Sequence, residues 1–137
     1  MFGSLVASAE ELAGIPLFES LSESDLQELA SWFDQRTADK GVRLIGEGAA
    51  GYSFFILTEG SAVVTSGDTT LADLGPGDFF GEVAILEESR RTATVTTTTP
   101  AKLLVMFGSD FRRLQQAQPG ITARIEDAMQ QRLSINT

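Results

Sequence analysis

The residues best suited to chemistry lie close together in the segment Asp78–Val95. Gly81 is expected to open a short helical turn, and the free backbone N–H groups at about Val83 and Ala84 can then point toward an anion. Arg91 stands at the head of the next predicted strand, where its guanidinium can make two parallel hydrogen bonds to phosphate oxygens. Together these features predict a phosphate-binding turn.

Glu82, which follows the glycine, restricts the kind of phosphate that this turn can hold. A carboxylate beside a bound phosphate is repulsive unless it accepts a hydrogen bond from a hydroxyl group of the same ligand. A phosphorylated sugar therefore suits Glu82 and Arg91 better than free phosphate does. The residues alone leave a second interpretation open, in which Glu82 and Arg91 form an ion pair that ties a loop to the neighbouring strands.

The elements that must position this segment follow from the periodicity of apolar residues. In the N-terminal third, Ser22 is followed three residues later by Asp25, and apolar residues recur at helical spacing over Leu26–Phe33. This pattern predicts a capped amphipathic helix over about residues 23–33. A shorter helix is expected before it, over Glu10–Ala13.

From about residue 36 to residue 107, short β-rich pieces separated by glycines predict a compact antiparallel roll or barrel. A hairpin turn is expected at Ser66–Asp68 and a tight corner at Gly75–Asp78, because glycine accepts the positive φ that such turns need. The predicted strands are Val42–Ile45, Ser53–Leu57, Ser61–Thr65, Thr70–Leu74, Thr92–Thr97 and Ala101–Phe107.

Two helices are predicted at the C-terminal end. Ser109 can cap a helix over about residues 110–117, and Pro119 suits the first turn of a second helix that runs to about Ser134. Arg132 lies on an otherwise apolar face of that second helix. Two interpretations stay open for this residue: its stem packs while its charged head reaches water, or its guanidinium contacts a ligand.

Composition excludes several kinds of chemistry. The chain has no cysteine and no histidine, so it cannot build a disulfide framework, a zinc cluster, a cysteine nucleophile or a serine–histidine relay. Catalysis would be left to carboxylate, Lys, Tyr or Ser side chains. A metal-dependent enzyme with a similar roll would need inward-facing histidines. We therefore expect that the protein is not an enzyme and carries no metal or cofactor.

The charge and the hydropathy pattern restrict the partners. A net charge of −9 argues against direct binding of nucleic acid, because Lys and Arg side chains hold the phosphate backbone. No stretch approaches the ~20 uninterrupted apolar residues that a spanning helix needs. The N-terminus lacks a basic region followed by a long apolar one. The sequence therefore predicts a cytoplasmic protein without membrane insertion.

Two short runs carry a resemblance to a known family. Phe80–Leu86, followed by Arg91–Val95, resembles the phosphate-binding cassette of cyclic-nucleotide-binding domains, which occur in the bacterial catabolite activator, in regulatory subunits of cyclic-AMP-dependent kinase and in nucleotide-gated channels. The resemblance covers almost the whole chain. The other similar segments are Ile15–Phe18 with Leu26–Leu29, and Gly46–Gly48 through Phe54–Gly60.

The resemblance implies an α+β fold, an antiparallel, jelly-roll-like β-roll flanked by N-terminal helices and by C-terminal hinge and lid helices. The length of 137 residues suits one domain with one core. We therefore predict a single cyclic-nucleotide-binding domain over residues 1–137, with helices at about 8–33, the β-roll at about 35–107 and the C-terminal helices at about 109–134.

The resemblance also implies roles for the residues of the turn. Gly81 and the backbone of Glu82, Val83 and Ala84 would surround the cyclic phosphate. The Glu82 carboxylate would accept a hydrogen bond from the ribose 2′-hydroxyl, and Arg91 would neutralise the phosphate.

The base of the nucleotide would be contacted by residues from other elements. The resemblance implies that Leu71 and Val63 line the base side of the roll and that Arg132 approaches the base from the lid helix. In relatives that prefer cyclic GMP, a hydroxyl at the position of Thr92 can meet the guanine amino group, but Ser or Thr is also common there in cyclic-AMP binders. Strand alternation places Arg91 and Thr92 on opposite faces. We expect cyclic AMP as the ligand, with cyclic GMP as the alternative.

These expectations define a sensor domain that changes conformation when the nucleotide binds. The chain ends at Thr137, just after the expected lid helix, so we expect either a stand-alone sensor or an excised domain of a longer protein. The partners that would suit such a sensor are an output domain, another protein or a second copy bound through the C-terminal helix. The alternative is a degenerate domain of this fold that serves as a structural or protein-interaction module. A missing glutamate or arginine in the cassette would favour that alternative, and both Glu82 and Arg91 are present.

Overall fold

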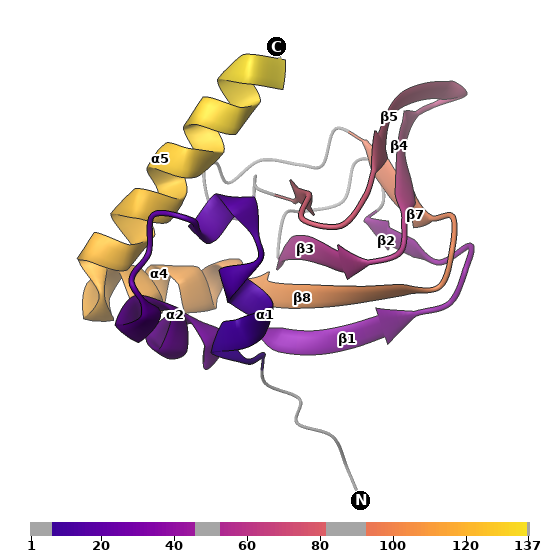
Figure 1. Ribbon diagram of the computed structural model, residues 1–137. Coiled ribbons are helices and arrows are strands. Elements are labelled where there is room, and N and C mark those ends of the chain that lie inside the picture. Colours follow the sequence, from indigo (N-terminus) through magenta and orange to yellow (C-terminus); the bar gives the residue numbers. More distant parts are fainter. Residues whose placement is uncertain (1–6, 46–52, 82–92, 137) are drawn as a thin grey trace, which may run out of the picture.

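The computed structural model describes residues 7–45, 53–81 and 93–136. The described residues form eight strands and several helices, and the helices gather on one side of the strands (Figure 1). All pairs among these described strands are antiparallel. The predicted α+β fold with an antiparallel roll is therefore confirmed.

The two N-terminal α-helices begin at side-chain caps that the sequence encodes. At the start of α1 (Ala9–Ala13), Ser8 and Glu11 form a reciprocal capping box. A short 3-10 helix, η1 (Pro16–Phe18), begins at a proline, and α2 (Glu23–Ala30) is capped by the predicted Ser22.

The predicted helix over residues 23–33 is too long by three residues. The Ser31 hydroxyl donates to the carbonyl oxygen of Glu28 at 2.7 Å, and the next N–H groups, of Trp32 and Phe33, bond to carbonyls three residues back. These bonds tighten the backbone into a turn after α2. Phe33 is 1% exposed at the end of this turn, so its burial is compatible with leaving the helix.

Within the part of the chain that the structure describes, the strands form two four-stranded sheets. In the first sheet the order is β1 (Asp34–Ala38), β8 (Ala101–Phe107), β3 (Ser53–Glu59) and β6 (Phe79–Phe80). In the second sheet the order is β2 (Arg43–Ile45), β7 (Thr94–Thr97), β4 (Ala62–Ser66) and β5 (Thr69–Leu74).

Two of these strands were not predicted from the sequence. β1 is polar and contains no buried residue, and it is held by pairing with β8 from Asp34 opposite Val105 to Ala38 opposite Ala101. β6 contains only two residues, which pair with β3. The other predicted strands agree with the structure within one or two residues where it describes them, although the first residue of predicted Thr92–Thr97 lies outside the described part.

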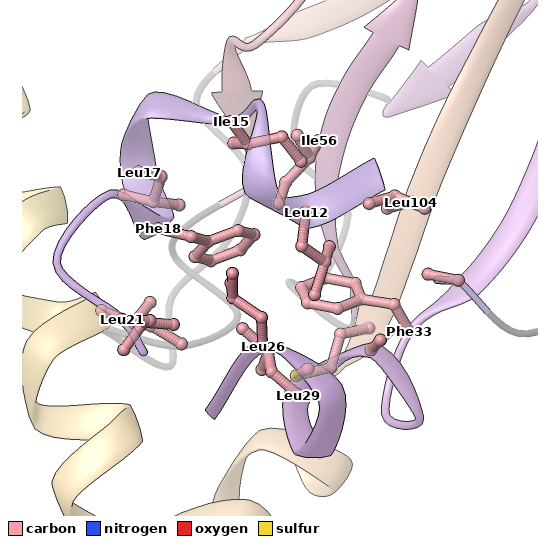
Figure 2. Close-up of a cluster of buried hydrophobic side chains, with 14 of the residues drawn as sticks. Leu12, Ile15, Leu17, Phe18, Leu21, Leu26, Leu29, Phe33, Ile56 and Leu104 are labelled. Atoms are coloured by element: carbon pink, nitrogen blue, oxygen red, sulfur yellow. The ribbon is translucent and has the colours of Figure 1, made fainter. Parts of the chain in front are cut away.

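The apolar side chains of the described residues form two clusters. The helical cluster lies between the helices and one face of the first sheet, and Figure 2 shows its side chains converging from both. The roll cluster lies inside the roll. The helical cluster consists of the buried apolar residues of segment 7–33, α4 and α5 together with Phe54, Ile56, Leu104 and Met106. The roll cluster consists of Leu57, Ala62, Phe80, Val95, Ala101, Leu103 and Val105.

The C-terminal helices are α4 (Gly108–Ala117) and α5 (Pro119–Asn136). The predicted cap at Ser109 is wrong, because β8 runs directly into α4. Phe107 is the N-cap residue with an extended backbone, and Gly108 is already helical. Pro119 begins α5 as predicted. The buried face of α5, which includes Ile121, packs into the helical cluster.

Candidate functional site

The tight turn predicted at Gly75–Asp78 is present, and two hydrogen bonds close it just before the candidate site. The Asp78 N–H donates to the Gly75 carbonyl at 3.1 Å, and the Gly75 N–H donates to the Asp78 carboxylate at 2.8 Å. Pro76 and Gly77 occupy the central positions, and Gly77 has a φ of 92°. This arrangement is a type II turn, which requires glycine at its third residue.

The turn is attached to the roll by two backbone hydrogen bonds to the same residue of β3. The Gly77 N–H donates to the carbonyl of Leu57 at 2.7 Å, and the Leu57 N–H donates to the carbonyl of Asp78 at 2.9 Å. Leu57 is completely buried. The entry to β6 is therefore fixed against the interior of the roll.

Gly81 follows β6 directly and has a φ of 77°. This left-handed conformation costs a residue with a side chain roughly 1–2 kcal/mol, so glycine is the residue that suits it. The preceding Phe80 is buried and stacks on Phe55, with ring centroids 5.0 Å apart and an angle of 6° between the planes. The structure thus supplies a sharply turned backbone at the position where the sequence predicts the start of the phosphate-binding turn.

The remaining cassette residues lie outside the described part of the chain. These residues are Glu82, Val83, Ala84, Arg91 and Thr92. Their predicted roles stay predictions.

The predicted lining residue Val63 has to be corrected by one position. Ala62 belongs to the roll cluster and Val64 packs against it. Because successive side chains of a strand point to opposite faces, Val63 is directed away from the roll interior. Sequence reasoning missed Val64. Ala62, two residues earlier in the same strand, is small and apolar, and it could have indicated that residues 62 and 64 share the face toward the roll interior.

Leu71 lies at an irregularity in the pairing of β4 with β5. Val64 pairs with Ala72 and Thr65 pairs with Thr70, so Leu71 is the extra residue of a bulge. Its side chain is 56% exposed, which is unusual for a leucine in a sheet. The structure therefore leaves an apolar side chain uncovered on this hairpin.

The backbone of Arg132 lies in α5, and its side chain is outside the described part of the chain. α5 lies on the helical side of the molecule, away from the β4–β5 hairpin (Figure 1). It is held there by its apolar face and by Arg124, whose Nη1 donates to the carbonyl of Ser20 at 3.0 Å. The helix that was expected to cover the base thus packs on η1 and α4 in this structure.

Two further observations concern the described residues only. They contain no group of three or more Asp or Glu side chains placed to hold a metal ion. None of their helices combines the length and the apolar character that crossing a bilayer requires.

The described residues thus form an antiparallel roll in which a hydrogen-bonded turn, the short strand β6 and the left-handed Gly81 follow one another directly. Residues 35–118 match the family model of the cyclic nucleotide-binding domain. Because this match covers more than half of the chain, the protein belongs to the cyclic nucleotide-binding domain family.

Known relatives and a solved structure resemble the chain over most of its length. It is 34% identical over 119 residues to a cyclic nucleotide-gated potassium channel of Mesorhizobium japonicum, a match that covers 87% of this chain and 33% of the channel. It is 38% identical over 104 residues to a cAMP-dependent protein kinase regulatory subunit of Eremothecium gossypii, covering 75% and 23%. The chain thus spans a third or less of these relatives. The N-terminal domain of a transcriptional regulator from Streptomyces coelicolor has a TM-score of 0.77 at 30% identity, covering 93% of this chain and 94% of that domain.

Proposed function

We propose that this domain binds a cyclic nucleotide inside the β-roll, that it prefers cyclic AMP to cyclic GMP, and that it acts as a cytoplasmic regulatory sensor without catalytic activity. The observation that carries the proposal is the left-handed turn at Gly81, directly after the two residues of β6. The sequence continues from this turn with Glu82 and, after a short loop, Arg91.

The cyclic phosphate and the ribose would be held by different groups. The backbone at Gly81, Glu82, Val83 and Ala84 would donate hydrogen bonds to the phosphate, and Arg91 would balance its charge. The Glu82 carboxylate would accept a hydrogen bond from the 2′-hydroxyl. This division explains why a carboxylate and an anion can share one site.

The base would lie against the apolar side of β4 and β5. Val64 packs on the roll cluster and Leu71 is exposed, so both offer apolar surface to a planar base. Arg132 would approach the base from α5. Thr92 would contact the base if the chain bends just before β7. A hydroxyl at this position also suits the guanine amino group, so cyclic GMP is the alternative ligand.

Calorimetric titration with cyclic AMP, cyclic GMP and 5′-AMP tests the binding proposal. Cyclic AMP should bind with a Kd of about 1 μM or lower, which corresponds to roughly −8 kcal/mol. Linear 5′-AMP should bind much more weakly, because its dianionic phosphate is not tied back to the ribose and would crowd Glu82. Equal affinity for the cyclic and the linear nucleotide would contradict the proposal. Absence of binding by all three would favour a structural or protein-interaction domain.

Binding would shift α5 between two positions. The ligand can drive such a shift only through a higher affinity for the closed position. We therefore expect the amides of residues 121–129 to exchange with deuterium more slowly when cyclic AMP is present, and Arg132→Ala to reduce both the affinity and this protection. Identical protection with and without ligand would contradict the movement of α5 and leave the binding proposal standing.

The receiver of this movement would be an output domain, another protein or a second copy of the chain. The similar channel and kinase regulatory subunit both extend well beyond the matched region. Sedimentation equilibrium with and without cyclic AMP tests the homodimer, which would form through α5. The net charge of −9 makes duplex DNA an unsuitable direct partner, and a gel-shift assay at physiological salt should show no retained band.

A further inference from the structure

A row of four phenylalanine rings runs from the N-terminal helical segment to the strand before Gly81. The ring centroids of Phe18 and Phe33 lie 6.0 Å apart, those of Phe33 and Phe54 lie 6.4 Å apart, and those of Phe54 and Phe79 lie 5.9 Å apart. In all three pairs the ring planes are tilted by 50–55°, a geometry in which aromatic rings attract one another. Figure 2 shows Phe18 and Phe33 pointing into the same interior.

The last ring of this row belongs to β6, which joins the two clusters. Phe79 packs against the helical cluster, and its neighbour Phe80 belongs to the roll cluster. β6 contains only these two residues and pairs only with β3 in the described part of the chain. On the roll side β6 is held by its pairing with β3 and by the stacking of Phe80 on Phe55. On the helical side it is held by the contact of Phe79 with Phe54.

A second contact links the same helical segment to the turn before β6. Pro16 begins η1, the 3-10 helix that ends at Phe18. Its Cδ atom is so close to Gly77 that a Cβ atom added there would lie 3.3 Å away. η1 therefore reaches the chain just before β6 through Pro16 and reaches β6 itself through the aromatic row.

We infer that Phe79 is a positioning residue for the nucleotide site: through its ring the helical cluster holds β6 in place, and β6 in turn holds Gly81, the residue that follows it. This inference rests on the proposed function. It assigns a binding role to a side chain that faces away from the roll interior and does not touch the nucleotide.

Phe79→Leu tests the inference, with Phe111→Leu as the matched control. Phe111 is buried in the same cluster but belongs to α4 and is not part of the row. Phe79→Leu should weaken cyclic AMP binding by roughly three- to tenfold, the range expected for loss of one aromatic pair, whereas Phe111→Leu should change it by less than about twofold. Phe79→Tyr keeps the ring and should keep the affinity.

Amide exchange without ligand provides an independent measurement. The N–H groups of Leu57 and Gly77 bond across the turn before β6. In Phe79→Leu these two amides should exchange faster, relative to global unfolding, than in Phe111→Leu. Pro16→Ala, which removes the contact with the turn, should accelerate the exchange of the same amides. It replaces Phe79→Leu in this test if that variant does not fold.

The outcomes separate this inference from the proposed function. If the parent protein does not bind cyclic AMP, the proposed function fails, and the exchange of Leu57 and Gly77 still decides whether Phe79 fixes the turn. If Phe79→Leu matches Phe111→Leu in both affinity and exchange, Phe79 is an ordinary packing residue and the inference is wrong.

Discussion

The two hydrophobic clusters differ in how many large side chains they bury almost completely. Among the largest described side chains that are almost wholly buried, every one except Leu57 belongs to the helical cluster. In the second sheet, by contrast, β5 is exposed along almost its whole length, and Leu71 stands more than half exposed. The comparison indicates that the helical cluster provides most of the packing, whereas the roll keeps apolar surface uncovered at the place where a ligand is proposed.

Two adjacent leucines of β8 test this contrast directly, because Leu104 faces the helical cluster and Leu103 the roll cluster. Leu104→Ala should lower the free energy of unfolding by about 3–5 kcal/mol, since tightly packed surroundings cannot collapse into the cavity. Leu103→Ala should lower it by about 2–3 kcal/mol. Urea unfolding followed by circular dichroism measures both. Equal losses would show that the roll is packed as tightly as the helical side.

Arg91→Ala should abolish most of the cyclic AMP affinity proposed for the roll and leave the packing of the helical cluster unchanged. Truncating one partner of a desolvated charge contact costs ~2–5 kcal/mol, so cyclic AMP affinity should fall more than tenfold in calorimetry. Glu82→Ala should also reduce affinity, but by less. Arg91→Lys is the control that keeps the charge and loses the paired hydrogen bonds, and it should fall between the two extremes. If both alanine variants lose stability and retain full affinity, the pair is a structural ion pair.

A pair of glycines tests how the turn before β6 differs from an isolated hairpin. Gly77 has a positive φ and lies against Pro16, whereas Gly67, in the predicted hairpin turn between β4 and β5, has a positive φ with open space around it. Gly67→Ala should cost about 1–2 kcal/mol of unfolding free energy from backbone strain alone. Gly77→Ala should cost about 2–3 kcal/mol, because the added methyl group also crowds the proline ring. Thermal unfolding measures the difference. Equal losses of unfolding free energy would show that Pro16 moves aside without cost when the methyl group is added.

The smallest effect is expected at the far end of the first sheet. The Lys102 ammonium lies 3.3 Å from the Glu59 carboxylate, and both side chains are almost two-thirds exposed. Lys102→Ala should change the free energy of unfolding by less than about 0.5 kcal/mol, since water and salt screen such a pair. A larger loss in urea unfolding would show that this surface contributes more than its exposure indicates.

Much of this fold could be predicted from local sequence signals. The glycine-bounded apolar runs identified most of the strands, and Ser22 and Pro119 marked two helix starts correctly. Strand β1 could not be predicted, because its residues Asp34–Ala38 are polar and only pairing with distant β8 makes them a strand. The missed end of α2 has a similar cause, because Phe33 fits helical spacing but is buried after the helix has ended.

The candidate site was less completely predictable. The need for glycine at positions 77 and 81 follows from their turns, and both have positive φ. Val63 was predicted in place of Val64 because the two neighbours are both valines, so residue type alone could not show which of them faces the roll interior. The role of Phe79 was not visible, because the aromatic row joins residues far apart in the sequence and exists only after the helices dock on the strands.

β8 supplies side chains to both clusters, and this has a consequence for folding. Leu104 and Met106 point to one side of the strand, and Leu103 and Val105 point to the other. Neither cluster can come apart while the other stays intact, so the domain should unfold in one cooperative transition. The pairing of Asp34 with Val105 also joins the beginning of the roll to its end. On a ribosome, the roll cluster can be completed only once β8 has emerged, and the helical cluster has to wait longer, because it also needs α4 and α5.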